Sequence, residues 1–525
     1  MKPRISDKIR VLISNKYLDW AEHLPKFNGS FVMNLQDIRE DQRSRAEKEF
    51  RRSRPPEGTK IEYLYFRLIE IFHIEEFDKL LEGLIRLFPG LQDNSRNRDF
   101  LTDFRKLAGT IAGGGMYRLG LIYRDLKGKF FFSGSHCEIK DLPPEVTYVA
   151  VALHKVLPSI MFVTLDVHLT EEATERLLAL QERYFLPKTR FFNLTPWKAA
   201  RGYSQESIEI VRANEIFAWI DNLRGRVEKC IRSFCDGYFM QQISEKPRLP
   251  AIEVYGLKGL PEGEEAFQKW SNEARDWSES LGFHFHYDTY SDGKTLFTWS
   301  HTDSVHRYKG YRLTVLWKPY VESLKSSPSE GEERDAIMHY TEYTLDAILP
   351  CIGVIEFLIS ARRNVERLRQ VVFGSMRIRS LPRYTLNKHI KLNNIIKRES
   401  MLLDRIAMEF EQRTNYIRYE MEPVQDMKET KTIPDGKQGG NLRDIMIESV
   451  KFDIGLLKKH LSLITTSFSE YLAARNMQVT YRLQRSIWGL TIVVTIATIA
   501  GLAANWPNIQ NLLNGLMKIM KSILR

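Results

Sequence analysis

The 525-residue sequence is poor in cysteine and lacks a secretory signal. Its four cysteines, Cys137, Cys230, Cys235 and Cys351, form no CxxC pair and no zinc-ligand spacing, which argues against a disulfide framework and favours a reducing compartment. The first twenty residues carry Lys or Arg every few positions and have no apolar core, unlike a secretory signal. Motifs of phosphate-binding loops, kinases, zinc proteases and serine hydrolases are also absent, so the sequence favours a protein that is not an enzyme.

The composition is that of a folded protein. Hydrophobic residues make up 43% of the chain and charged residues 27%, which is enough apolar surface for several cores. At roughly 100–200 residues per domain, three or four folded units are expected. The net charge is +11, but the basic residues alternate with acidic ones, which argues against a nucleic acid partner.

One segment, Ser486–Trp506, predicts a transmembrane helix. It contains no ionisable side chain, and its 21 residues would span about 30 Å, the thickness of the bilayer hydrocarbon. Trp488 and Trp506 lie near its ends, where indole rings favour the membrane interface. No other segment of comparable length exists, so the sequence predicts a single-pass membrane protein.

Basic residues on both sides of this segment bear on its orientation. Arg475, Arg482 and Arg485 precede it, and the positive-inside tendency then places the large N-terminal part in the cytoplasm, at the inner (cell) membrane. Residues 507–525 follow, with apolar residues at intervals of three and four and with three basic residues. This pattern predicts an amphipathic helix at the membrane surface.

The rest of the chain predicts an α+β cytosolic body, followed by a long coiled-coil-like helical stalk and one C-terminal transmembrane helix. Apolar alternation indicates strands in the first 320 residues, and helical periodicity dominates afterwards. The expected parts are a charged helical segment (1–55), a mixed α+β domain (56–245), a second α+β segment (246–325), a helical region with linkers (326–440), the stalk (441–485), the span (486–506) and the interfacial tail (507–525).

The stalk carries the clearest periodicity in the chain. Apolar residues recur at alternating intervals of three and four, which makes a narrow seam for another helix. The partner is either the helix expected over residues 386–420 of the same chain or further copies of the stalk in a homo-oligomer, and both interpretations stay open. The seam consists of Ile447, Val450, Ile454, Leu457, Leu461, Ile464, Phe468 and Tyr471.

A polar stripe runs through the predicted span. Polar side chains that line up in lipid need a partner, so one interpretation is a pore lining. The alternative is that the threonines bond carbonyls of their own helix or pack helices together. The stripe consists of Gln484, Thr491, Thr495, Thr498 and Asn505.

A divalent metal is the only cofactor that the residues suggest. His284, His286 and Asp288 follow an H-x-H-x-D pattern, and on a strand they would share one face. Three nitrogen and oxygen ligands on one face suit zinc or a similar ion. Histidines two residues apart are also ordinary on strands of half-exposed sheets, so a metal site and an ordinary surface both stay open.

The stalk enters the span through Tyr471-Leu472-Ala473-Ala474-Arg475-Asn476-Met477. Together with the soluble body, this arrangement resembles the CorA-type divalent-cation channel superfamily over residues 440–510. In that family five copies surround a pore and a Gly-Met-Asn motif closes the first of two spans. Here the corresponding place reads Ala503-Ala504-Asn505-Trp506-Pro507, and a clear second span is absent.

Divergent relatives in that superfamily are membrane effectors of bacterial immune systems that respond to nucleotide messengers. The resemblance therefore implies an ion channel or an antiviral defence effector with a nucleotide or another small molecule as ligand. From these features we expect an oligomeric membrane protein whose cytosolic body senses a ligand or partner. A membrane-tethered metal-dependent enzyme and a tail-anchored scaffold are the alternatives.

Overall fold

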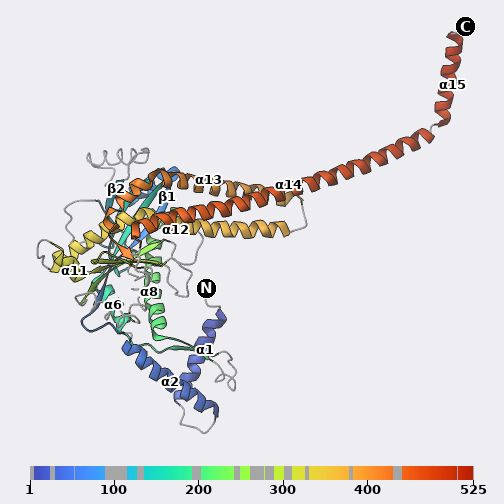
Figure 1. Cartoon of the computed structure of the whole chain (residues 1–525). Helices are drawn as coiled ribbons and strands as arrows, with labels where there is room; N and C mark the ends of the chain where they lie inside the picture. Colours follow the sequence, from blue (N-terminus) through green and yellow to red (C-terminus); the bar gives the residue numbers. More distant parts are fainter. Residues whose placement is uncertain are drawn as a thin grey trace. The chain divides into compact units, whose positions relative to one another are not determined.

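The computed structural model shows a body rich in β-sheet and, towards the C-terminus, long helices (Figure 1). The contacts divide the chain into two units, Met1–Ile359 with Asp404–Ile454, and Ser360–Leu403 with Gly455–Arg525. At this level the predicted order of an α and β body followed by long helices is confirmed. The structure describes residues 5–23, 30–52, 54–88, 115–126, 135–191, 203–241, 249–259, 277, 289–300, 310–324, 330–377, 382–429, 440–504 and 506–523.

The first unit is built on a ten-stranded sheet of order β12-β9-β10-β11-β8-β1-β5-β4-β2-β3. Its neighbours pair antiparallel except for β11 with β8 and β2 with β3. A separate hairpin joins β6 and β7. The strands are β1 (Lys60–His73), β2 (Gly115–Tyr123), β3 (Ser135–Glu138), β4 (Val146–Leu157), β5 (Ile160–Leu169), β6 (Lys188–Phe191), β7 (Tyr203–Glu206), β8 (Ala251–Lys258), β9 (Thr289–Ser291), β10 (Thr295–Ser300), β11 (Gly310–Leu316) and β12 (Lys428–Glu429).

The helices described in the first 320 residues have at most 24 residues, and the three longest helices, α12, α13 and α14, follow them. The long ones reach 48 residues in α12 and 63 in α14. They are α1 (Ile5–Glu22), α2 (Ser30–Arg52), α3 (Phe77–Leu87), α6 (Glu171–Glu182), α8 (Ile208–Ile231), α11 (Trp317–Glu322), α12 (Glu330–Arg377), α13 (Pro382–Glu420), α14 (Leu442–Ala504) and α15 (Trp506–Ile523), with single 3-10 turns η1 (Ile74–Glu76) and η2 (Glu422–Val424).

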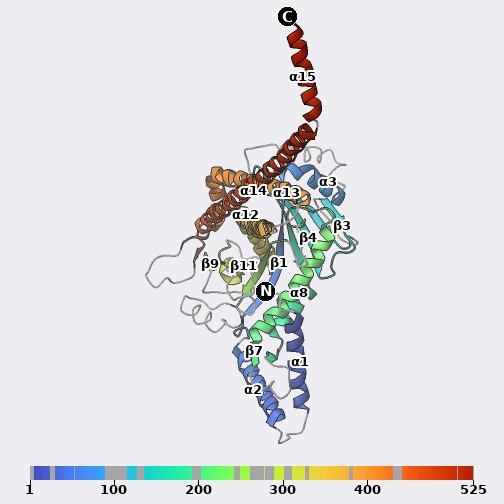
Figure 2. The same cartoon turned by 90° about the vertical axis from the view of Figure 1, so that its right-hand side faces the viewer.

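The central strands β1 and β5 are covered on both faces, so nearly all of their residues are buried, including the charged residues Arg67, Glu70 and Asp166. On one face lies α12, whose Gly353 faces the Phe162 ring of β5. The other face carries the segment that follows α8, where the backbone N–H groups of Phe239 and Met240 donate to Glu70 of β1. Figure 2 shows α8 and α12 on opposite sides of β1. The sheet is therefore the middle layer of the body.

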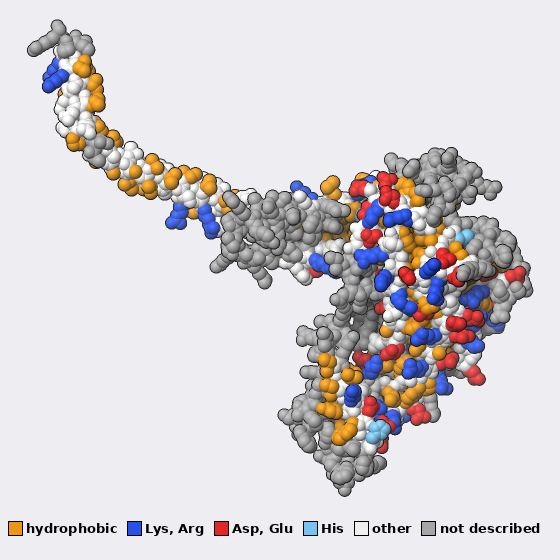
Figure 3. All heavy atoms as spheres, turned by 180° about the vertical axis from the view of Figure 1, so that it is seen from behind, with side chains coloured by type: hydrophobic (Ala, Val, Ile, Leu, Met, Phe, Trp, Pro, Cys, Tyr) orange, Lys and Arg blue, Asp and Glu red, His pale blue; other side chains and the backbone are white. Residues whose placement is uncertain are grey.

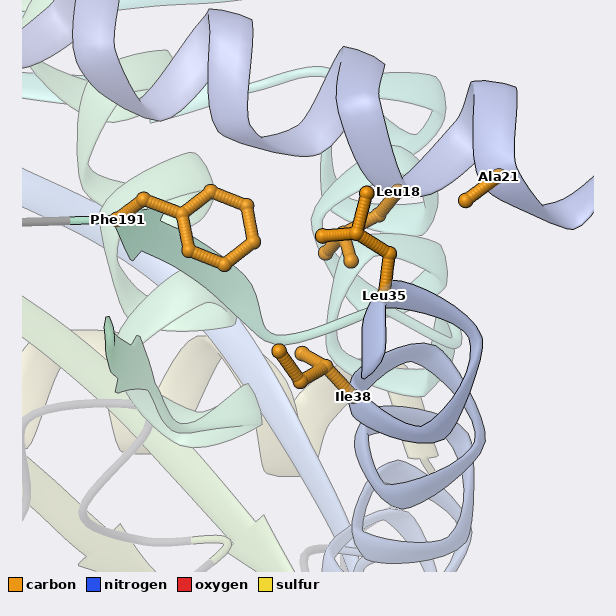
Figure 4. Packing of buried hydrophobic residues seen from close by; sticks show 5 residues of the cluster. All are labelled: Leu18, Ala21, Leu35, Ile38 and Phe191. Carbon is orange, nitrogen blue, oxygen red and sulfur yellow. The ribbon is translucent and has the colours of Figure 1, made fainter. Parts of the chain in front are cut away.

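A helical hairpin precedes the sheet. Helices α1 and α2 pack together and against β6 around a small core of Leu18, Ala21, Leu35, Ile38 and Phe191 (Figure 4). Polar contacts fix the hairpin to the same strand, since the backbone N–H of Phe191 donates to Ser14 Oγ at 2.9 Å. The charged N-terminal segment is thus folded against β6 and Tyr203 of β7.

The described residues of the second unit are all helical. It holds the last part of α12, the first part of α13, and α14 from Gly455 together with α15. Its buried residues lie on all three long helices and include Val365, Ile396, Leu457, Leu461 and Phe468. The helices lie side by side in both Figure 1 and Figure 2. The core of this unit is therefore a bundle formed within one chain.

Candidate functional site

A buried arginine lies at the centre of the large sheet. Arg67 of β1 pairs in register with Asp166 of β5, and its guanidinium binds both oxygens of that carboxylate, with Nε to Oδ1 at 2.6 Å and Nη2 to Oδ2 at 2.8 Å. The Arg67 side chain is only 1% exposed. Such a two-point pair is the geometry in which a buried arginine is best stabilised. The strand register alone thus creates the first half of the site.

Helix α12 supplies the second half. Its Asp346 accepts from Arg67 Nη1 at 2.6 Å, so two carboxylates share one guanidinium. One turn earlier, Thr341 accepts from the Tyr65 hydroxyl at 3.1 Å and Glu342 accepts from Arg118 at 2.7 Å. These three contacts fasten one face of α12 to strands β1 and β2. We call the set Arg67, Asp166, Asp346, Tyr65 and Thr341, with the rim pair Arg118 and Glu342, the sheet–helix network.

The pKa values in this network follow from burial and from the shared charge. Burial would lower the pKa of Arg67, but attraction to Asp166 and Asp346 outweighs it and holds that pKa well above its usual value. Burial raises the pKa of the Asp346 carboxyl, and Arg67 offsets only part of that rise. Arg67 therefore stays charged. Helix α12 contributes two carboxyls to the network, and Arg67 binds that of Asp346, whereas that of Glu342 binds Arg118.

Two histidines next to the network are neutral. Burial, with the positive charge of Arg67 and Arg118, lowers the pKa of His154 to about 3. Burial also lowers the pKa of His168 to about 4. The 3.8 Å approach of His154 Nε2 to Asp346 Oδ1 is therefore no ion pair near neutral pH, and the closer partner of that nitrogen is Thr164 Oγ1 at 3.1 Å.

The His168 imidazole lies between two tyrosine rings. Tyr65 and Tyr148 are its register partners on β1 and β4, and their ring centroids stack at 4.9 and 4.2 Å from that of His168. Its Nε2 atom is buried, yet it meets no hydrogen-bond partner in the part of the chain that the structure describes. A buried polar atom without a partner costs stability, so this nitrogen has a hydrogen-bonding capacity that the described part of the chain does not use.

The opposite face of the sheet holds two further buried carboxyl groups, those of Glu70 and Glu253. The Glu70 carboxyl accepts three backbone N–H groups, those of Ile71, Phe239 and Met240, and burial raises its pKa to about 8. Glu253 of β8 accepts from Arg312 of β11 at 3.1 Å. Both groups tie loops or strands together and have no unpartnered acceptor of the kind seen at His168. We regard them as structural.

The C-terminal helix α14 differs from the rest of the chain in exposure. Over Leu442–Ala503 it contains an apolar window with a mean hydropathy of 1.9, and none of that window is buried. The other helix with a long apolar stretch, Glu332–Arg367, has 83% of its window buried. Figure 3 shows hydrophobic side chains along the exposed part of α14, with basic side chains where this part begins. Among the described residues, α14 alone therefore offers an uncovered apolar segment long enough to cross a membrane.

The predicted stripe in this segment meets its hydrogen-bond needs locally. The hydroxyls of Thr491, Thr495 and Thr498 each donate at 2.8 Å to the carbonyl four residues earlier, those of Ile487, Thr491 and Val494. Gln484 is exposed, and Asn505 lies outside the described residues. Because the threonine hydroxyls have partners in their own helix, they can lie in lipid without a polar neighbour.

The predicted stalk seam is buried within the single chain. Seven of its residues are at most 8% exposed, and Tyr471 is half-buried. The buried ones are Ile447, Val450, Ile454, Leu457, Leu461, Ile464 and Phe468.

The proposed metal ligands His284, His286 and Asp288 lie outside the described residues. In the ranges that are described, no group of three His, Cys, Asp or Glu side chains is placed to hold a metal ion.

The sequence interpretation missed the sheet–helix network. A signal was present, because Arg67 and Asp166 are charged residues inside strands that otherwise read as buried apolar runs. What the sequence could not give was their pairing with each other and with Asp346, which lie 99 and 279 positions from Arg67.

Comparison of the sequence with protein-family models and with curated proteins, and of the structure with solved structures, finds no match.

Proposed function

We propose that the chain is a membrane-anchored sensor, held in the bilayer by residues 486–504 of α14, whose α/β body responds to a ligand or partner. The observation that carries this proposal is the exposed apolar segment of α14. Burying roughly 20 apolar residues in lipid is strongly favourable, whereas leaving them in water is not. The self-bonded threonines support an anchor over a pore lining.

The basic residues support one orientation. Arg482 and Arg485 are exposed and lie one turn apart just before the apolar segment. With these side chains at the cytoplasmic headgroups, the body lies on the cytoplasmic side. We propose this topology, with a single crossing and with α15 at the opposite membrane surface.

The sensing role is supported by the sheet–helix network. His168 Nε2 is a buried position that a ligand can use, and it lies beside Tyr65, whose hydroxyl bonds α12 through Thr341. Helices α12, α13 and α14 each contribute residues to both units. A ligand that weakens or strengthens the contacts between the sheet and α12 would therefore act on a helix that also belongs to the bundle.

Membrane insertion is tested by alkaline extraction and flotation of the full chain. We expect the wild-type protein to stay with the membrane, and Val493→Asp/Ile496→Asp to shift it to the soluble fraction. Each charge at the centre of a span costs roughly 3 kcal/mol on insertion scales. Met477→Asp/Tyr481→Asp is the matched control, because both residues are exposed on the same helix before the apolar segment. A wild-type chain that is extracted by alkali would overturn the proposal.

A further inference from the structure

The region around the apolar segment has an unusual charge. Residues 471–525 contain six basic residues and no acidic one, although the whole chain has 66 Asp and Glu. Between Arg485 and Lys518 no ionisable side chain occurs. The positive charge is therefore concentrated at the two ends of an apolar stretch. The basic residues are Arg475, Arg482, Arg485, Lys518, Lys521 and Arg525.

Helix α15 separates its residues completely by polarity. At about 100° of rotation per residue, every apolar residue from Ile509 to Ile523 falls on one half of the helix. The other half holds two lysines among uncharged polar or small residues. The apolar half consists of Ile509, Leu512, Leu513, Leu516, Met517, Ile519, Met520 and Ile523, and the polar half of Asn508, Gln510, Asn511, Asn514, Gly515, Lys518, Lys521 and Ser522.

Most of the apolar half of α15 is exposed in the described part of the structure. Leu512, Leu516 and Met520 are 67%, 49% and 60% exposed. A helix with such a face and with lysines centred on the opposite face lies in the plane of a membrane interface. Lys518 and Lys521 are three positions apart, so their ammonium groups point to the same side, towards the headgroups.

We propose that the two basic pairs, Arg482 with Arg485 and Lys518 with Lys521, bind the headgroups of anionic phospholipids, so that α15 lies flat on membranes that contain them. The inference rests on the proposed anchoring by α14. The occupant is a lipid surface rather than a protein, because the face combines uncovered apolar residues with positive charge that no acidic residue of this region balances. Basic residues near an anionic surface strengthen binding about five-fold each.

The test uses the full-length protein in nanodiscs made of phosphatidylcholine alone or of an equal mixture with phosphatidylglycerol. Amide hydrogen exchange is measured for peptides from residues 506–523. We expect exchange of these amides to be about 30-fold slower in the anionic nanodiscs than in those of phosphatidylcholine alone. Each of the two lysines contributes about five-fold to this difference. Lys518→Gln/Lys521→Gln should abolish most of that difference, because glutamine keeps the helix and the side-chain length but removes the charge.

The control variant is Lys451→Gln/Lys459→Gln, which removes two charges from exposed positions of α14 far from the apolar segment. It should leave the lipid dependence unchanged. Equal exchange in both nanodiscs overturns the anionic-lipid proposal and leaves the anchor intact. Failure of the protein to enter any nanodisc instead overturns the anchor. Protection in detergent that grows with protein concentration would assign the face to a second copy and also overturn the proposal.

Discussion

At the scale of single residues, Arg67 is the most consequential charge in the body. It is buried, and it is the shared partner of Asp166 and Asp346. Arg67→Met should lower the free energy of unfolding by about 3–5 kcal/mol, because it leaves two carboxylates in a low-dielectric environment without their counter-charge. The measurement is urea unfolding of the detergent-solubilised protein, followed by tryptophan fluorescence.

Arg118→Met provides the comparison for this change. Arg118 pairs with Glu342 on the same face of the sheet, but its side chain is 63% exposed, so its loss should cost about 1 kcal/mol or less. Similar costs for both variants would show that Arg67 is not the ion-pair centre that its geometry indicates. Adding Asp166→Asn and Asp346→Asn to Arg67→Met should restore part of the stability, since neutral amides cost less to bury than carboxylates.

A second prediction at this scale concerns pH. The folded-state pKa of His154 is about 3, below its unfolded value near 6.5, so only the unfolded chain binds a proton there as the pH falls. The contribution of neutral His154 is fully present above pH 6.5 and is lost as the pH falls towards 3. At pH 5 the loss amounts to about 2 kcal/mol.

His154→Gln should therefore reduce the fall in melting temperature between pH 7 and pH 5. Thermal unfolding at several pH values measures it, and His339→Gln is the control because His339 is exposed on α12. In the wild type and in His339→Gln alike, the groups that face the His154 imidazole are Arg67, Arg118, Asp346 and Thr164. An unchanged pH profile in His154→Gln would contradict the assignment of a neutral buried imidazole.

At the scale of elements, the packing of α12 on the sheet depends on a residue without a side chain. A Cβ atom at Gly353 would lie 2.2 Å from Cε1 of Phe162, whose ring is fully buried on β5. Gly353→Ala should therefore destabilise the body by about 1–3 kcal/mol, because the helix or the ring must move. Urea unfolding measures the effect.

Gly455→Ala is the matched control in another long helix. Nothing lies within 4 Å of a Cβ atom placed there. Alanine has the higher helix propensity, so this change should stabilise the protein by up to about 1 kcal/mol. Opposite signs for the two substitutions would support close contact between α12 and β5, and a stabilising Gly353→Ala would contradict it.

An element can be predicted from the sequence when the pattern that specifies it lies within one segment of the chain. The apolar part of α14 follows from composition alone. The apolar stretch Ala347 to Ile359 contains Pro350 and Glu356, which favours a buried or kinked helix over a membrane span. In contrast, β1 lies between β5 and β8, and β8 is some 180 positions away in sequence. Such long-range pairing depends on the strand register and on which faces of the sheet are covered. Neither can be predicted from the sequence of a single segment.

The candidate site shows the same division. The seam residues were predicted from spacing, and the structure buries them. The sheet–helix network was not predicted, because Arg67 in one strand gives no information about which strand and which helix turn will supply its carboxylates. A charged residue in a buried strand indicates that a residue of opposite charge lies next to it. Which residue that is becomes known only from the fold.

At the scale of the whole molecule, the stalk seam raises the question of whether copies associate. In the single chain seven of the eight seam residues of α14 are already buried, which leaves little of that seam for a second copy. Association through the stalk would then need another surface. The remaining candidates are exposed apolar residues of α14 such as Phe452 and Leu463 and the apolar segment itself.

Two leucines of α14 separate these possibilities. Leu461 is 2% exposed and Leu463 is 58% exposed. Leu461→Ala should cost about 2–5 kcal/mol in stability because it leaves a cavity in the bundle, and Leu463→Ala should cost little.

If the seam is closed within one chain, the mass of the detergent-solubilised particle by light scattering is the same for the wild type and for Leu461→Ala under conditions where both are folded. A mass that falls with Leu461→Ala but not with Leu463→Ala would instead place the seam between copies, because removal of a buried contact weakens the interface to which it belongs. A mass that falls only with Leu463→Ala would assign association to the outer face of α14 and leave the bundle as an intramolecular structure.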